Sequence, residues 1–494
     1  MASDIDPKRL PDWDQVAMRT YFQVALVSGC RPSRTGTIVT NVNAQCFPFD
    51  EECDTDEAVQ SIQGALGRLA QQCPQLAGSL FLGNSAQSNL VFLENFPGHI
   101  PLEVYASEDE TSPDFTYDNL REENFPPDKF VGPWFGIDGS LSEGRAAKRV
   151  PVSKVRLLFF PGGMLLWLHL HHSLGDGNCL DMFIESLAAQ TRHAEIPCPI
   201  NVGLEFPPGR CQCNRSLNCL LDACTEYALL PSPTGPTTPT LGRGLWDLPE
   251  IEKTGKIFVF SADLLEELRA LVQDSSESLF PSRPTIYACL AAFAWVHITR
   301  VRFDTELLVP LEERLTDAKL FIPVDWRRRS CFPTSTADYF GNTAATVVAT
   351  APVMELAVAC NDTEIFARVV RNVTDSIRAV DERWVEDRNA LFARIDDPRR
   401  LGLNHDPRRP QELGFNTWRF IGADHQWNIP GVPADRPDAI RRSQRQWGMA
   451  GALLLPARAH SPFYELLVSL PVCSMEALCE DEQWMDWVDE IVGE

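Results

Sequence analysis

The sequence lacks the features that would place the chain in a membrane, in a secretory pathway or on nucleic acid. Its longest apolar stretch, VRLLFFPGGMLLWLHL, is broken by the segment 161–163, before it reaches the ~18 continuous apolar residues of a membrane span. The first residues, MASDIDPKRLPDWDQ, contain no apolar core of signal-peptide length. Positive charge is scarce, and a formal net charge of -24 argues against nucleic acid or an anionic membrane as a partner. We therefore expect a cytoplasmic protein without a membrane span.

The length of the chain predicts two domains. A single hydrophobic core stops growing at roughly 250–300 residues, and this chain has 494. Both halves alternate segments of strand and helix periodicity, which indicates an α/β fold. Between them the pattern fades, and LLPSPTGPTTPTLGRG has the composition of a connection. We expect an N-terminal domain at 1–204, a crossover linker at 205–250 and a C-terminal domain at 251–494.

Several elements are expected from local patterns. The apolar spacing predicts a helix at 54–73, ended by Pro74, and two strands at 152–160 and 164–172 joined by a Pro-Gly-Gly turn. Further predictions are an apolar helix at 285–302, a charged helical region at 353–395, a hairpin over 451–471 and a helix at 475–492.

The 15 cysteines are not arranged as a disulfide framework, and we expect reduced thiols. Cys211, Cys213, Cys219 and Cys224 are clustered, but their spacing matches no standard zinc module. We expect no metal at this cluster.

Histidine is also scarce, with nine residues in the chain, yet three of them occur within MLLWLHLHHSLGDGN. Strand alternation places His172 on the face of the preceding leucines, at the strand end, and His169 and His171 on the opposite face. A turn follows, and Asp176 stands where it can cap the next helix.

Three interpretations of these histidines compete. A metal site would use His169 and His171, but it needs further ligands, and Ser173 stands where a metallo-hydrolase strand carries an aspartate. His169 and His171 are therefore interpreted as packing residues. His172 is the candidate general base, because loops at strand ends present chemistry and imidazole titrates near neutral pH.

Five segments carry a resemblance to a known family. HHSLGDG (171–177) fits an H-x-x-x-D-G motif, and DWRRRSCFPTSTADYFGN (325–342) resembles the family's D-x-R…YFGN segment. CPQLAGSLF, TIYACLAAFAWVHITRVR and the GALLLPA…FYELLVSLP hairpin follow the same order over about residues 20–490. The chain thereby resembles the BAHD acyltransferases of the chloramphenicol acetyltransferase and condensation-domain superfamily. Its spacing is similar to the fungal branch typified by trichothecene 3-O-acetyltransferase.

The resemblance implies a fold and an activity. It implies two chloramphenicol-acetyltransferase-like domains, each a mixed sheet with helices, with a channel at their interface and a segment near 415–445 packed with the N-terminal domain. The implied reaction is acyl-CoA-dependent transfer of an acetyl or short acyl group to a hydroxyl of a specialised metabolite. It needs no permanently bound cofactor and no metal, uses acyl-CoA, with acetyl-CoA the expected form, as co-substrate, and suits a monomer whose other partner is the small-molecule acceptor.

The resemblance also assigns residues. His172 is the general base, Asp176 supports the motif by pairing with an arginine, and Gly177 lets the chain pass close to the base. In FNTWRFIGADHQWNIPG (415–431), Trp418 is the oxyanion or substrate candidate. Asp424 stands for the aspartate of a family D-F-G-W-G segment whose phenylalanine and glycines are absent here.

Basic residues are expected near the phosphates of CoA. The candidates are the arginines at 327–329, those of DPRRP (406–410) and those of RRSQR (441–445).

Two alternatives stay open from the sequence. The altered loop after Trp418 suits a relative that uses His172 for CoA-independent condensation or cyclisation. A non-catalytic binding relative is the other, although binding alone would not require an imidazole at the strand end.

Overall fold

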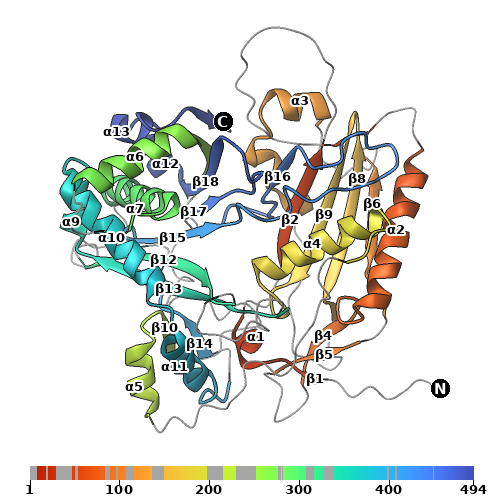
Figure 1. Ribbon diagram of the computed structural model, residues 1–494, viewed down its shortest axis with the longest axis horizontal. Coiled ribbons are helices and arrows are strands. Elements are labelled where there is room, and N and C mark those ends of the chain that lie inside the picture. Colours follow the sequence, from red (N-terminus) through yellow and green to blue (C-terminus); the bar gives the residue numbers. More distant parts are fainter. Residues whose placement is uncertain are drawn as a thin grey trace.

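The computed structural model describes most of the chain, and the structural statements below concern the described residues. These are 8–17, 21–28, 47–49, 54–83, 90–95, 98–106, 115–135, 149–196, 215–229, 252–275, 280, 282–306, 316–327, 329, 339–397, 400–406, 409–448 and 450–493. They form two α/β domains that lie side by side, each with its own sheet (Figure 1).

The N-terminal domain is built on a mixed sheet. Its strands, in spatial order, are β16 (Ala439–Arg441), β2 (Tyr21–Ser28), β9 (Gly163–His171), β8 (Ser153–Phe160) and β6 (Leu102–Ala106), with β3 (Phe47–Pro48) paired to β9. A smaller sheet contains β1 (Lys8–Arg9), β5 (Val91–Glu94), β4 (Ser79–Leu82) and β7 (Val150–Pro151). The helices of this half are α1 (Asp12–Val16), α2 (Thr55–Gln72), α3 (Tyr117–Glu122) and α4 (Gly177–Thr191), with 3-10 turns at Pro127–Phe130 and Pro133–Phe135.

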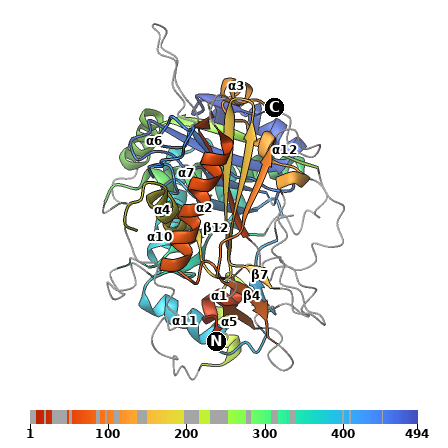
Figure 2. The ribbon, with the colours of Figure 1, turned by 90° about the vertical axis from the view of Figure 1, so that its right-hand side faces the viewer.

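The hairpin of β8 and β9 has the alternation that the sequence predicts. Gly162 at its turn has φ of 74°, a conformation that glycine adopts without a steric penalty. Leu166, Leu168 and Leu170 pack with α2 and α4, which lie along that face of the sheet (Figures 1 and 2). Trp167 faces the other way into a separate aromatic cluster. The last residues of β9 therefore lie at the edge of the sheet where α4 begins.

The C-terminal domain contains a longer mixed sheet. Its strands, in order, are β13 (Ala344–Ala351), β12 (Ala318–Asp325), β15 (Glu412–Thr417), β17 (Gly451–Leu454), β18 (Phe463–Pro471), β11 (Lys253–Ser261) and β19 (Glu490–Val492). The helices of this half are α5 (Leu217–Ala223), α6 (Ala262–Ser275), α7 (Ile286–Thr305), α9 (Val353–Ala359), α10 (Thr363–Arg378), α11 (Glu382–Phe392), α12 (Val472–Cys479) and α13 (Glu482–Met485). A two-stranded sheet joins β10 (Tyr227–Leu229) to β14 (Leu401–Leu403).

The two faces of this longer sheet have different neighbours. One face packs against α6, α7 and α10, and nearly the whole of α7 is buried between the sheet and the other helices. The opposite face contributes Ile257, Val259, Leu453 and Leu467 to the core that also contains the β9 leucines. The apolar core of the N-terminal domain thus continues across the interface onto this face of the longer sheet.

Three stretches differ from the sequence predictions. The charged region at 353–395 is divided into three helices, because Asp362 and Asp381 each cap a new helix. The end of the region expected to be helical at 475–492 is strand β19, which pairs with β11. The stretch 205–250 was expected to be irregular, yet it contains α5 and β10; residues 205–214 and 230–250 lie outside the described part.

The last part of the chain returns to the N-terminal sheet. β16 pairs with β2 in the register Ile440 to Leu26. The next residue, Arg441, crosses to the other domain, where its Nη1 lies 2.8 Å from Oε2 of Glu465 on β18. Its Nε donates to the carbonyl of Phe125. Within the described part of the chain, none of the helices combines the length and apolar character that a membrane crossing requires.

The Arg441–Glu465 pair should contribute strongly to stability. Both side chains are at least nine-tenths buried, so Arg441→Ala leaves a buried carboxylate without its cation, at a cost of roughly 3–5 kcal/mol. Urea unfolding should show the loss. The control is Arg371→Ala, which removes a partly exposed pair with Asp375 on α10 and should cost no more than about 1 kcal/mol. Equal losses of unfolding free energy in the two variants would contradict a stabilising role for the Arg441–Glu465 pair.

Candidate active site

His172 lies directly after β9, in the turn that leads to α4. The turn is held by a 2.8 Å hydrogen bond from the backbone N–H of Leu174 to the carbonyl of His171. His172 is partly exposed, whereas its neighbours His171 and Ser173 are fully buried. The imidazole is thus held at a fixed position and remains accessible.

Asn342, from the C-terminal domain, determines which ring nitrogen of His172 carries the proton. The Nδ2 of Asn342 donates to the His172 carbonyl at 2.7 Å and to Oδ1 of Asp14, also at 2.7 Å. Because the peptide carbonyl of His172 can only accept, the atom that faces it must be the amide nitrogen, and the amide oxygen therefore faces Nδ1 of His172, 3.1 Å away. That oxygen accepts, so Nδ1 bears the hydrogen and the lone pair is on Nε2.

The electrostatic surroundings keep the ring neutral. Burial lowers the pKa of His172 below its usual 6.5, and a hydrogen bond with its own backbone, the nearby carboxylate of Asp176 and the hydrogen bond with Asn342 only partly offset this effect. A neutral imidazole with its lone pair on Nε2 is the form that can accept a proton at physiological pH.

Asp176 joins the two domains through a buried ion pair. Its two carboxylate oxygens each lie 3.0 Å from Nη2 of Arg327, which follows β12, and both side chains are almost completely buried. Asp176 also caps α4 by accepting from Cys179 N at 3.2 Å, and it accepts from Thr343 N at 2.9 Å. Burial opposes ionisation of Asp176, but Arg327 and the backbone donors outweigh it and hold the pKa below its usual range. Asp176 is therefore an ionised structural group.

Cys179 is buried and hydrogen-bonded in a way that does not suit a nucleophile. Its Sγ lies 3.3 Å from the carbonyl of Gly341 and accepts from the N–H of the same residue at 3.2 Å. Burial raises the pKa of the thiol well above its usual value. A thiol of this kind does not form the thiolate that covalent catalysis requires.

Gly175, rather than Gly177, is the glycine at which the chain makes a close approach. A Cβ on Gly175 would lie 2.5 Å from the Cβ of Cys179. A Cβ on Gly177 would meet only the flexible end of Ile421, at 3.4 Å. A side chain would therefore not fit at Gly175, whereas Gly177 has room for one.

His169 and His171 are packed on the opposite side of β9. Both are buried, and burial, followed by the charges of Arg156 and Lys154, lowers the pKa of His169 well below its usual value. Nδ1 of His171 accepts from the N–H of Ser173 at 3.2 Å. Across the described residues, no three His, Cys, Asp or Glu side chains are grouped to hold a metal ion. Cys211 and Cys213 of the cysteine cluster lie outside those residues.

Trp418 and Asp424 are placed differently with respect to the motif. Trp418 is buried, and its turn, closed by a hydrogen bond from Ile421 N to Trp418 O, brings Ile421 against Gly177. Asp424 is exposed and accepts from Ala459 N at 2.9 Å. The structure therefore brings Ile421, in the turn that begins at Trp418, against the motif and leaves Asp424 at the surface.

Several arginines considered for CoA binding have other partners. Arg327 pairs with Asp176, and Arg441 with Glu465. Arg329 donates to the carbonyls of Ile377 and Val380. Arg442 has an exposed side chain with its guanidinium 6.0 Å from the Trp418 ring, and Arg445 is exposed as well. Of the candidate arginines within the described residues, Arg442 and Arg445 therefore suit a phosphate ligand best.

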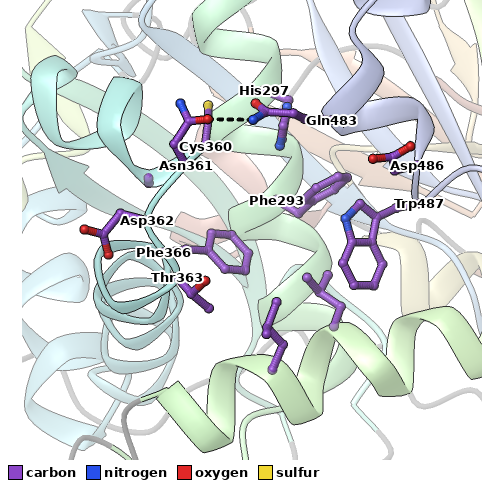
Figure 3. Close-up of a pocket in the computed structure, with 13 residues that line it drawn as sticks. Phe293, His297, Cys360, Asn361, Asp362, Thr363, Phe366, Gln483, Asp486 and Trp487 are labelled. Atoms are coloured by element: carbon purple, nitrogen blue, oxygen red, sulfur yellow. Dashed lines mark hydrogen bonds between the residues drawn. The ribbon is translucent and has the colours of Figure 1, made fainter.

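A pocket of about 330 Å³ lies in the C-terminal domain between α6, α7, α10 and α13. Its walls include the rings of Phe293, Phe366 and Trp487, and a hydrogen bond between Asn361 and Gln483 lies at its edge (Figure 3). None of its lining residues belongs to the His172 motif. It is a feature separate from the candidate active site.

Two residues of the site were not identified from the sequence. Asn342 stands in YFGN, which supported the family resemblance but was given no chemical role. Asp14 stands in a short helix that has no motif to mark it. The only signal for Asn342 was its place in the YFGN segment, and its partner Asp14 could not be inferred from local patterns.

The sequence matches two family models. Residues 38–190 match the trichothecene 3-O-acetyltransferase-like N-terminal domain, and residues 144–485 match the Transferase family. The O-acyltransferase pigD of Monascus ruber is 23% identical over 476 residues, which cover 90% of this chain and 94% of that protein. Trichothecene 8-O-acetyltransferase of Fusarium sporotrichioides is 20% identical over 483 residues, with 88% and 93% coverage.

Solved structures share the fold. TRI101 of F. graminearum, complexed with coenzyme A and T-2 mycotoxin, gives a TM-score of 0.77 at 16% identity, covering 99% of this chain and 100% of that chain. Vinorine synthase gives 0.60 at 16% identity, covering 99% of this chain and 95% of that one. The two-domain α/β fold expected from the resemblance is confirmed.

The two glycines of the motif should respond differently to substitution. Gly175→Ala forces a methyl group against Cys179 and should destabilise the protein by roughly 1–3 kcal/mol. Gly177→Ala introduces a better helix former in the first turn of α4 and should be neutral or stabilising by up to about 1 kcal/mol. Thermal melts of both variants measure the difference. A Gly177→Ala variant that is the less stable of the two would contradict this assignment.

Proposed function

The chain belongs to the Transferase family and is an acyltransferase, and we propose that it transfers an acyl group from acyl-CoA to a hydroxyl group with His172 as the general base. The observation that carries the proposal is the hydrogen-bond pattern of Asn342, which assigns the lone pair to Nε2 of His172. The partial exposure of His172 supports access by a substrate. The burial that lowers its pKa supports a neutral base at pH 7.

The reaction balances with this one base. The Nε2 of His172 accepts the proton of the acceptor hydroxyl while the hydroxyl oxygen attacks the thioester carbonyl carbon. The tetrahedral intermediate then expels the CoA thiolate as the C–S bond breaks, and the imidazolium returns the proton to the sulfur. The products are an ester and free CoA. Asn342 stabilises the intermediate imidazolium, because its amide oxygen accepts from Nδ1.

The oxyanion of that intermediate needs a hydrogen-bond donor. We assign this role to Trp418, because its indole N–H can only donate and its turn packs against Gly177. Asp176 acts by holding the turn and not by moving a proton, since it is buried and fully engaged by Arg327 and backbone donors.

The donor and acceptor classes rest on likeness to other proteins. Two relatives are named as O-acyltransferases, and a solved structure with the same fold contains coenzyme A and a mycotoxin. We propose acetyl-CoA as the donor and a hydroxyl of a small hydrophobic specialised metabolite as the acceptor. Arg442 and Arg445 are the residues we assign to the CoA phosphates.

The central test is His172→Ala. Loss of a general base should reduce kcat by about 10²–10⁴-fold while the melting temperature stays near that of the parent. Release of CoA thiol from acetyl-CoA, measured with a panel of hydroxylated small molecules, gives the rate. His460→Ala, which alters an exposed histidine, is the control. A folded His172→Ala enzyme with full activity would refute the mechanism.

Binding of the donor is tested independently of turnover. CoA at 100 times its Kd should stabilise the native protein by about 2.7 kcal/mol. A His172-dependent reaction that neither requires nor responds to CoA would instead favour condensation or cyclisation.

The pH dependence follows from the direction of the His172 shift. A base is active when unprotonated, and burial lowers the pKa of His172 below 6.5. The acid-side loss of kcat/KM that reports protonation of His172 should therefore have its midpoint below pH 6.5 and be absent in His172→Ala. A parent profile with no such loss below pH 6.5 would show that His172 is not the base.

A further inference from the structure

Asp14 is a buried carboxyl group that lies behind Asn342 in the candidate active site. It is 3% exposed, and its Oδ1 accepts from both the backbone N–H and the side-chain amide of Asn342, at 2.9 and 2.7 Å. The same amide bonds to the carbonyl and faces the imidazole of His172. Asp14, Asn342 and His172 thus form one hydrogen-bonded chain that crosses the domain interface.

Contacts with both domains fix the helix that carries Asp14. The side chain of Gln15 forms two hydrogen bonds with the backbone of Val91 on β5, at 2.7 and 2.8 Å. On the other side, Nε1 of Trp13 donates to Asn389 of α11 at 2.6 Å. These anchors hold the carboxyl group at its position, so it need not reorganise during a reaction.

We propose that Asp14 is a positioning residue for acyl transfer, acting through Asn342 to hold the Nδ1–H tautomer of His172 and to stabilise its positive charge. The proposal rests on the proposed function of His172. A carboxylate that accepts from an amide N–H polarises the amide, so the amide oxygen becomes a stronger acceptor for Nδ1–H. That polarisation favours the imidazolium formed when Nε2 takes the acceptor proton.

The charged and titratable groups around Asp14 determine when it carries charge. Asp176 and Arg327 act on it in opposite directions, and it acts on Tyr339 in turn. Burial is the largest influence and raises the pKa of Asp14 to about 7. The carboxyl group of Asp14 therefore becomes negatively charged as the pH rises through 7. We call the hydrogen-bonded chain of Asp14, Asn342 and His172 the relay.

The test compares Asp14→Asn with Asp12→Asn, the same change on the same helix at a partly exposed residue that pairs with Arg9. In the parent, kcat/KM should rise in two steps, first as His172 loses its proton and then near pH 7. Asp14→Asn should lose the second step, with about tenfold lower kcat/KM at pH 8, a part of the 10²–10⁴ that a general base supplies. It should converge with the parent below pH 6, and Asp12→Asn should follow the parent throughout.

Asn342→Ala is the second variant, because it keeps Asp14 but breaks the link. It should also lose the step near pH 7, and adding Asp14→Asn to it should cause no further loss. Additive losses, or an Asp14→Asn profile that superimposes on the parent profile, would overturn the proposal.

Stability provides a readout that does not depend on activity. A carboxyl group whose pKa is raised from 3.8 to about 7 on folding destabilises the native state progressively as pH rises between those values. The melting temperature of Asp14→Asn minus that of the parent should therefore increase from pH 4 to pH 7 and then remain constant. An inactive parent would refute the proposed function and with it the relay. An active parent with an unchanged Asp14→Asn profile would refute the relay alone.

Discussion

The buried ion pair between Asp176 and Arg327 is the constraint on which the active site depends. Two charges removed from water destabilise a protein unless each is fully paired. Here Asp176 is bound by Arg327 and by backbone N–H groups, and Arg327 also donates to the carbonyls of Tyr339 and Gly341. Since the two partners belong to different domains, any loosening of the interface would separate the buried Asp176 carboxylate from its cation, whereas Arg327 would keep its pair with Asp325. The pair therefore fixes how the domains dock.

The position of His172, the proposed base, depends on this pair through Asn342. Asn342 stands between Gly341, which binds Arg327, and Thr343, which binds Asp176. Hydrogen bonds fix both neighbours of Asn342, and its amide nitrogen donates to Asp14 and to the His172 carbonyl. The amide oxygen is thereby directed toward the imidazole of His172. The buried charge of Asp176 and the imidazole of His172 are thus separate groups joined by one short segment.

The sequence predicted those parts of the site that depend on local rules. The alternation of β9, the strand-end position of His172 and the cap of α4 by Asp176 all follow from periodicity and capping within a few residues. The roles of Asp14 and Asn342 did not follow, because their meeting depends on tertiary packing between segments more than 300 residues apart. The C-terminal segment 490–492 shows the same limit: its helical pattern is overridden by pairing with β11.

The return of β16 to the N-terminal sheet has a consequence for biosynthesis. β2 lies between β9 and β16, so part of one of its edges is covered by residues that follow it by more than 400 positions in the chain. On the ribosome, the N-terminal half emerges and collapses first. Until residue 441 has been translated, β2 presents an unpaired edge, the kind of surface that recruits strands from other chains. The nascent protein thus carries this exposed strand edge until β16 has been synthesised.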